Sequence, residues 1–255
     1  MTKLCLDSIK LIAGKKALCN SLSITINSGE CWGLLGKNGA GKTSLLKCIA
    51  GILKPEEGNI SLDAIPIQNH DRKNLALRVG MLFQEGLSSI PSTVFETVLL
   101  GRYPHSKYSI KDSLSDIQTT QNILEELKLN ELRDRELDTL SGGELQKVGI
   151  ALLLAQDPEL FLLDEPINHL DIAFAAQLKT ILKERVSKRS ASLLLATHDI
   201  NYVNEFCDSL ILMLGDGNLI LGKTQEVLTE KNLSEAFSCK ISKFSNGIST
   251  IFHSV

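Results

Sequence analysis

The stretch GKNGAGKT, residues 36–43, decides how the rest of the sequence is interpreted. It fits the pattern GxxxxGK[ST] and lies between the apolar run ECWGLL and the helical run TSLLKCIAGIL, as this motif requires. Glycines let the backbone curl so that successive N–H groups point at phosphate oxygens. A chance glycine-rich turn would lack this strand–loop–helix context. The stretch therefore predicts a site that binds the phosphates of a nucleotide.

Different residues of this loop are expected to bind different parts of the nucleotide and its metal ion. Lys42 adds a mobile positive charge for the β and γ phosphates, and Thr43 can place its hydroxyl on Mg²⁺. The helix that begins here adds the partial positive charge of its N-terminus. The predicted nucleotide-binding residues of the loop are Gly36, Lys37, Asn38, Gly39, Ala40, Gly41, Lys42, Thr43 and Ser44.

Two adjacent carboxylates end a second apolar run, FLLDE at residues 161–165. Such a run is typical of a parallel strand buried on both faces, and ligands of open α/β sheets collect at the carboxyl ends of these strands. Asp164 is placed to hold Mg²⁺, directly or through water, and Glu165 to polarise the water that attacks the γ-phosphate. Adjacent carboxylates usually form only a solvated strand end. Here a phosphate loop lies upstream and Pro166 terminates the strand, which favours the catalytic interpretation.

Two further polar residues each follow a predicted strand. His198 comes directly after the buried run SLLLAT, and Gln84 closes VGMLFQ, residues 79–84. Because these strand ends share a sheet edge with Asp164, we expect His198 to contact the γ-phosphate and Gln84 to sense the metal and the attacking water. The other histidines show no partner spacing and are interpreted as ordinary core or surface residues: His70, His105, His169 and His253.

The remaining sequence alternates strand-like and helix-like segments. The first thirty residues alternate apolar and polar positions, which indicates half-buried antiparallel strands. Residues 88–140 are helical in pattern, and the later helices GELQKVGIALLLAQ and IAFAAQLKTILKERV alternate with buried strands. We therefore expect an α/β fold in which helices wrap a mostly parallel P-loop NTPase sheet. An N-terminal antiparallel β subdomain, an inserted α-helical subdomain and a C-terminal hairpin turning at Asn246-Gly247 would complete it.

Composition excludes several classes of protein. With 255 residues, a net charge of −3 and a pI near 6.0, the chain resembles an ordinary globular protein, and its charge argues against nucleic acid as the main partner. No apolar run reaches the length of a membrane span, and MTKLCLDSIK lacks the apolar stretch of a signal peptide. Any membrane role should therefore be peripheral, from the cytoplasmic face. Six scattered cysteines without a CxxC pair indicate reduced thiols: Cys5, Cys19, Cys31, Cys48, Cys207 and Cys239.

Together these motifs resemble the ATP-binding subunits of ABC transporters, over nearly the whole chain and in the family's order. Residues 36–43 resemble the Walker A loop, residues 161–165 Walker B, Gln84 the Q-loop and His198 the switch histidine. LSGGE, residues 140–144, resembles the signature that is specific to this family. Leu170-Asp171 resembles the D-loop.

The resemblance implies how the second glycine-rich helix start is used. In this family two ATPase domains pair head to tail, and the signature of one faces the ATP held by the other. It implies ATP and Mg²⁺ as cofactors, Lys42, Glu165 and His198 as catalytic residues, and a homodimer of this chain. Thr43, Gln84 and Asp164 would hold the metal. The signature residues that would act across the dimer are Ser141, Gly142, Gly143 and Glu144, with Asp171 in the D-loop.

A narrower resemblance concerns the partners. TVFETVLLGRYPH, residues 93–105, is similar to the segment after the Q-loop in importers of iron-siderophore, haem and cobalamin. It implies two copies of the chain beneath integral membrane permease subunits, supplied by a substrate-binding protein. Three alternatives stay open: a zinc or manganese importer ATPase, a soluble ABC ATPase outside transport, and a non-hydrolysing regulator.

The same resemblance divides the chain into parts and shows where it departs from the family. One ATPase domain, 1–255, would consist of a RecA-like core (1–87 and 141–237), a helical insert (88–140) and a C-terminal hairpin (238–255). Ile12 stands at or near the position where relatives often stack an aromatic ring on adenine. Leu145 and Ile167 replace residue types that are common in the family, and Trp32 is expected in the core.

Overall fold

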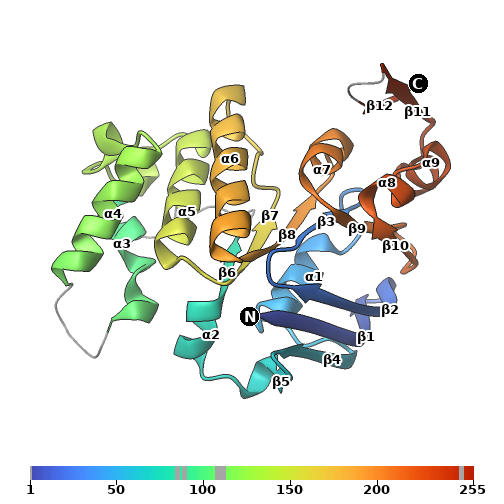
Figure 1. The fold of residues 1–255 in the computed structure, drawn as a ribbon, viewed down its shortest axis with the longest axis horizontal. Helices are drawn as coiled ribbons and strands as arrows, with labels where there is room; N and C mark the ends of the chain where they lie inside the picture. Colours follow the sequence, from blue (N-terminus) through green and yellow to red (C-terminus); the bar gives the residue numbers. More distant parts are fainter. Residues whose placement is uncertain (1, 84–86, 88–90, 107–112, 247–249) are drawn as a thin grey trace.

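The short apolar runs form the centre of a sheet whose strands are buried on both faces. The computed structural model describes residues 2–83, 87, 91–106, 113–246 and 250–255. Within this part of the chain the main sheet has six strands in the order β10-β9-β3-β8-β7-β6, and all except β10 run parallel (Figure 1). Its strands are β3 (Cys31–Leu35), β6 (Val79–Leu82), β7 (Leu160–Asp164), β8 (Ser192–Thr197), β9 (Ser209–Met213) and β10 (Leu219–Lys223).

Alternate side chains of each central strand enter two different cores. In β7, Leu160 and Leu162 face one core, whereas Phe161 and Leu163 face the other, because successive side chains of a strand point to opposite faces. The first core lies against α1 (Lys42–Ile49) and an antiparallel sheet in the order β2-β1-β4-β5. The strands of that sheet are β1 (Lys3–Ala13), β2 (Lys16–Asn27), β4 (Glu57–Leu62) and β5 (Ile65–Pro66).

The second core is covered by helices. Figure 1 shows α3, α4, α5 and α6 as a group on one side of the molecule, with α7, α8 and α9 farther along the sheet. The segment between β6 and α5 holds α3, α4 and three short 3₁₀ turns, Tyr103–His105, Asn130–Leu132 and Leu137–Thr139. The helices are α2 (Arg72–Arg78), α3 (Val94–Leu100), α4 (Leu114–Glu126), α5 (Gly142–Gln156), α6 (Ile172–Arg189), α7 (Ile200–Phe206), α8 (Thr224–Val227) and α9 (Glu230–Phe237); a further 3₁₀ turn spans Ile67–Asn69.

These elements confirm the α/β fold class expected from the sequence. The strand expected over residues 79–84 is shorter, since β6 ends at Leu82, and Gln84 lies outside the described residues. Trp32 is partly buried against the first core, as expected, and its indole N–H donates to Glu30 at 3.0 Å. The boundaries after residues 87, 140 and 237 stay predictions. Within the described part of the chain, no helix is both long and apolar enough to cross a membrane.

The C-terminal hairpin is present and docks on α7. Strands β11 (Ile241–Ser245) and β12 (Thr250–Ser254) pair antiparallel; of the predicted turn, Gly247 lies outside the described residues. The Asn201 side chain donates to the Phe252 carbonyl at 3.0 Å and accepts the Phe252 N–H at 2.8 Å. The amide thereby pairs with β12 as a strand neighbour would. It ties the hairpin to the helix that follows His198.

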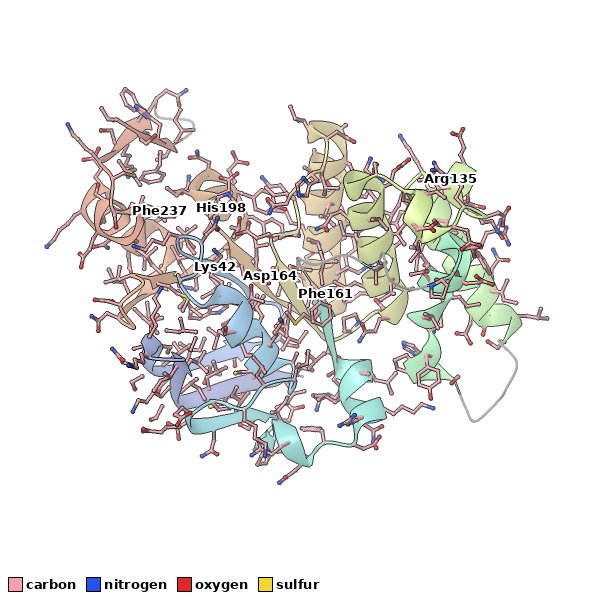
Figure 2. The ribbon with its side chains drawn as sticks, turned by 180° about the vertical axis from the view of Figure 1, so that it is seen from behind. Lys42, Arg135, Phe161, Asp164, His198 and Phe237 are labelled. Atoms are coloured by element: carbon pink, nitrogen blue, oxygen red, sulfur yellow. The ribbon has the colours of Figure 1, made fainter. Side chains whose placement is uncertain are left out.

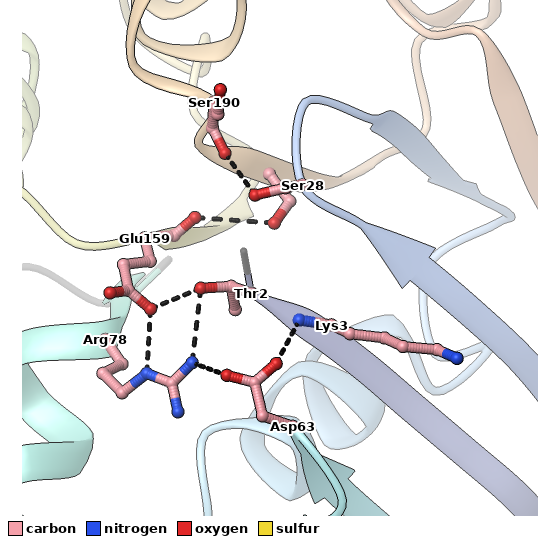
Figure 3. A network of polar contacts seen from close by, with 8 residues as sticks. Thr2, Lys3, Ser28, Asp63, Arg78, Glu159 and Ser190 are labelled. Atoms are coloured by element: carbon pink, nitrogen blue, oxygen red, sulfur yellow. Dashed lines mark hydrogen bonds and ion pairs between the residues drawn. The ribbon is translucent and has the colours of Figure 1, made fainter.

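A polar network lies at the amino-terminal end of β7, the end away from the phosphate loop. Figure 3 shows Arg78, at the end of α2, between Asp63 and Glu159, with its Nε 2.8 Å from the Glu159 carboxylate. Thr2 contacts both Arg78 and Glu159, and Asp63 also accepts the Lys3 N–H at 2.7 Å. The network links the starts of β1 and β7 to the turn between β4 and β5.

Candidate active site

The loop between β3 and α1 curls at the carboxyl edge of the parallel strands. Gly41 caps α1 with φ of +112°, and a Cβ there would lie 2.8 Å from the Leu18 Cβ. Both the backbone angle and the close approach therefore require glycine. A cavity of about 480 Å³ opens over the loop. It is lined by Ala13, Leu18, Asn38, Gly39, Gly41, Lys42, Thr43, Ser44, Asp164 and Glu165.

Most of the predicted nucleotide-binding residues of the loop line this cavity, whereas Gly36, Lys37 and Ala40 are not among its lining residues. Gly36 and Ala40 are buried, and the Ala40 N–H donates to the Lys37 carbonyl at 3.2 Å. Lys37 points its ammonium toward Ser238, at 3.3 Å. Ala13 lines the cavity in place of Ile12, whose side chain is 43% exposed. Small apolar contact with a base is therefore available at Ala13.

Lys42 is a buried cation held beneath the cavity. Its ammonium donates to the Gly36 carbonyl at 2.8 Å and lies 3.4 Å from Glu165 Oε1. Both side chains are less than a tenth exposed. A buried charge requires a partner, and here Glu165 supplies it. The amine is poised to exchange this carboxylate for a phosphate oxygen.

Asp164 has the features of a metal ligand. It is fully buried at the end of β7, and neither carboxylate oxygen has a hydrogen-bond partner among the described residues. Burial raises the pKa of Asp164, and the neighbouring Thr43 hydroxyl and Lys42 ammonium oppose the rise only in part. Unsatisfied buried oxygens are costly, and a hard cation would satisfy them. Magnesium commonly uses one or two carboxylates together with substrate phosphates, so Asp164 and Thr43 fit it.

Glu165 lies at the centre of a network of polar contacts. Its Oε2 accepts the Thr197 hydroxyl at 3.0 Å, and its Oε1 lies 2.9 Å from His198 Nδ1. His198 follows β8, and its side chain is half exposed. Figure 2 shows Lys42, Asp164 and His198 near one another although they come from three different segments. The Thr197 contact was missed from the sequence, although a hydroxyl residue directly before His198 was a visible signal.

The signature residues form a second, separate arrangement. Ser141 caps α5: its hydroxyl accepts the Glu144 N–H at 3.3 Å and lies 2.7 Å from the Glu144 carboxylate, which also accepts the Ser141 N–H at 2.8 Å. These hydrogen bonds from Ser141 lower the pKa of Glu144. Arg135 lies 3.7 Å from Glu144, and Figure 2 shows Arg135 well apart from Lys42 and Asp164. The structure therefore does not bring residues 141–144 into the phosphate cavity of the same chain.

The helix start is packed against the segment that follows Walker B. A Cβ on Gly143 would lie 2.6 Å from the His169 carbonyl oxygen, so only glycine fits there. Asp171 caps α6 by accepting the Phe174 N–H at 2.8 Å, and Lys147 from α5 lies 2.9 Å from its other oxygen. Leu145 packs on the second core, which accounts for an apolar residue there. Nothing in the structure explains Ile167.

A larger cavity, of about 840 Å³, lies elsewhere, beside α6, α7 and α8. Cys31, Phe206 and Cys207 line it, together with side chains of mixed charge. It shares no residue with the phosphate loop. The smaller cavity is the candidate active site because it joins the loop to Asp164 and Glu165.

Comparison with known proteins decides the family. Residues 19–168 match the family described as ABC transporter. The chain belongs to the ABC transporter family. Its ATP-binding domain is an ATPase, and the chain is an ATPase subunit of this class.

The ABC ATPase is similar to several named proteins over most of its length. It is 37% identical to an uncharacterized ABC transporter ATP-binding protein of Methanocaldococcus jannaschii, covering 92% of this chain and 91% of that protein. It is 30% identical to the ferric enterobactin transport ATP-binding protein FepC of Escherichia coli, covering 92% and 86%. It is 34% identical to the hemin import ATP-binding protein HmuV of Shewanella denitrificans, covering 91% and 92%.

A solved structure extends the likeness to the fold. A chain of an inward-facing, metal-chelate type ABC transporter superposes with a TM-score of 0.82 at 27% identity. The superposition covers 100% of the ABC ATPase and 97% of that chain. The antiparallel sheet, parallel sheet and helical covering described above are therefore those of ABC ATPases.

Proposed function

We propose that the ABC ATPase is the ATP-hydrolysing subunit of an importer for metal chelates of the iron-siderophore, haem or cobalamin type. The observation that carries the hydrolytic part is the junction of Lys42, Asp164 and Glu165 in one cavity, with His198 on Glu165. Phosphoryl transfer needs positioning and charge stabilisation rather than covalent catalysis, and these groups supply both.

Each side chain has a separate task. When ATP binds, the Lys42 ammonium leaves Glu165 and pairs with the β- and γ-phosphate oxygens. The N–H groups of the loop hold the phosphates. Released from Lys42, Glu165 orients the attacking water. His198 turns its half-exposed ring to the γ-phosphate. Asp164, Thr43 and the predicted ligand Gln84 would hold Mg²⁺, which would supply positive charge beside the phosphate oxygens.

The active site is completed by a second copy of the chain. Residues 141–144 offer N–H donors at a helix start but include no lysine, and they lie outside their own phosphate cavity. In a head-to-tail homodimer Ser141, Gly142 and Gly143 would donate to the γ-phosphate held by the partner's loop, beside Asp171. One ATPase domain per chain, with the helical insert at 88–140, gives each dimer two such sites.

The proposed partners are membrane permease subunits and, through them, a substrate-binding protein. Residues 93–105, which resemble the permease-facing segment of such importers, expose Leu100 and Tyr103, at 53% and 71%. Both side chains are accessible to a partner. The chain would then lie at the cytoplasmic face of the membrane. The names of the ferric enterobactin and hemin relatives, and of the metal-chelate transporter, support the cargo class.

Two experiments test this function. In the first, the purified ABC ATPase is assayed for Mg²⁺-dependent phosphate release, with Lys42→Ala expected to abolish ATP binding and the exposed Lys15→Ala as a matched control. In the second, cells lacking the gene are supplied with ferric siderophore, haem or cobalamin as the only source of iron or vitamin. Loss of uptake of one of these, restored by the gene, is expected. Normal uptake of all three would exclude the cargo class while leaving the ATPase activity untouched.

A further inference from the structure

Thr197 is a buried polar residue to which the hydrolytic mechanism proposed above assigns no role. It is the last residue of β8 and is completely buried. Its hydroxyl lies 3.0 Å from Glu165 Oε2. The backbone carbonyl of the preceding Ala196 accepts the Glu165 N–H at 2.8 Å, so two adjacent residues of β8 hold Glu165.

The direction of this hydrogen bond is fixed by a third residue. The Asp199 N–H donates to Thr197 Oγ1 at 3.1 Å. With an acceptor role already taken, the hydroxyl proton is free to point at the carboxylate, which accepts only. The hydrogen bond is therefore charge-assisted and lies in a buried setting, where such bonds are strong.

Thr197 differs from the other two partners of Glu165. Lys42 and His198 both contact Oε1, at 3.4 and 2.9 Å, and both are assigned to the phosphates once ATP is bound. ATP binding would therefore change both contacts to Oε1. Thr197 contacts the other oxygen, Oε2, and is buried away from the cavity lining.

Glu165 needs such a partner because its backbone sits in an uncommon conformation. Its φ is +49°, in the left-handed region that residues with a Cβ rarely adopt. Outliers of this kind persist only where surrounding contacts determine them. Gln146, Ala196 and Asn168 hold the Glu165 main chain, whereas Thr197 holds the carboxylate through Oε2, the oxygen that Lys42 and His198 do not contact.

We propose that Thr197 is a positioning residue that holds the Glu165 carboxylate in its water-orienting geometry throughout the ATPase cycle. The proposal rests on the proposed hydrolytic role of Glu165. Thr197 does not touch ATP or water itself; it acts through Glu165. Its removal should slow hydrolysis without weakening nucleotide binding.

The test compares Thr197→Val with Thr197→Ser. Valine keeps the shape of threonine and removes the hydroxyl, whereas serine keeps the hydroxyl and removes the methyl. We expect kcat of the valine variant to fall about 10-fold or more with KM for ATP unchanged, and serine to restore most of the rate. The ATP-bound dimer, measured by size-exclusion chromatography with ATP and Mg²⁺, should persist longer in the valine variant.

A matched control separates positioning from packing. Thr120 is also completely buried, and its hydroxyl has no hydrogen-bond partner among the described residues. Thr120→Val should leave kcat, KM and dimer lifetime at the wild-type values. If Thr197→Val does not fold, Thr197→Ala takes its place in the same comparison.

The outcomes distinguish the two proposals. Wild-type kcat in the folded valine variant, or a serine variant as slow as valine, would overturn the positioning role. So would a loss confined to KM. Normal hydrolysis by Glu165→Gln, measured in parallel, would instead overturn the hydrolytic role of Glu165 on which Thr197 depends.

Discussion

At the scale of single residues, Glu165 carries two incompatible demands. In the structure it pairs with Lys42, and in the proposed mechanism it faces a water molecule during hydrolysis. Because both side chains are buried, the pair cannot be left half-satisfied. In the proposed mechanism, phosphate binding to Lys42 would therefore be coupled to release of the Glu165 carboxylate.

Glu165→Gln separates binding from hydrolysis. The amide keeps the shape and can still accept the Thr197 hydrogen bond, but it cannot act as a base. We expect kcat for ATP to fall at least about 100-fold while ATP binding changes less than about 3-fold. Phosphate release and equilibrium dialysis measure the two quantities. The variant should accumulate as an ATP-bound dimer, and a variant that stays monomeric with ATP would contradict the coupling.

Ser141 favours the ionised form of Glu144 within the signature. Its hydrogen bonds lower the pKa of Glu144, so the carboxylate is ionised and held by the helix start. We expect Ser141→Ala to raise the pKa of Glu144 toward its ordinary value of 4.5, as measured by NMR titration of the carboxyl carbon. Ser187→Ala on α6 serves as the control. An unchanged Glu144 pKa in Ser141→Ala would show that the cap is not formed in solution.

At the scale of elements, the guanidinium of Arg102 joins the segment between β6 and α5 to α5 itself. Arg102, after α3, donates through Nε to Asp116 of α4 at 2.9 Å and through Nη1 to the Ala155 carbonyl of α5 at 2.7 Å. Burial disfavours ionisation of Asp116, but the hydrogen bonds from Ser113 and Arg102 outweigh it and lower its pKa. Three helices thus meet at one guanidinium.

Asp116→Asn should loosen this junction in a pH-dependent way. The folded-state pKa of Asp116 is below its ordinary 3.8, so its contribution to stability is full above that value and is lost as the pH falls through the folded-state pKa. At neutral pH we expect the free energy of unfolding to fall by about 1–3 kcal/mol. In acid, below the folded-state pKa, the variant and wild type should converge. Denaturant titrations measure both, with the exposed Asp138→Asn as a control that should change neither.

Most elements were predictable because each has its own local pattern. Buried parallel strands appear as continuous apolar runs. The motif at residues 36–43 predicts both the strand before it and the helix after it. The contacts between elements were not predictable. Asn201 pairs with Phe252 of β12, 51 positions away, and Thr197 pairs with Glu165, 32 positions away. The periodicity of the sequence carries no information about such pairs. The placement of Ala13 rather than Ile12 in the cavity depends on register between β1 and β2, which sequence alone does not fix.

At the scale of the whole molecule, the phosphate loop and the signature lie apart. Lys42, Asp164 and His198 gather at the carboxyl edge of the sheet, whereas Arg135, which contacts Glu144, lies toward the far end (Figure 2). The motifs predicted several residues that the structure brings together in one cavity, but the separation of that cavity from the signature is a property of the fold. Both sets can act on one nucleotide only if a second copy supplies the signature.

Mixing two inactive variants tests this composite site most directly. Lys42→Ala disables the phosphate loop and Ser141→Arg disables the signature, so each variant alone should hydrolyse no ATP. A mixed dimer contains one intact site, formed by the loop of the Ser141→Arg chain and the signature of the Lys42→Ala chain. We expect an equimolar mixture to recover ATPase activity, up to about a quarter of the wild-type rate if pairing is random. A mixture that remains as inactive as the separate variants would contradict a site shared between two chains.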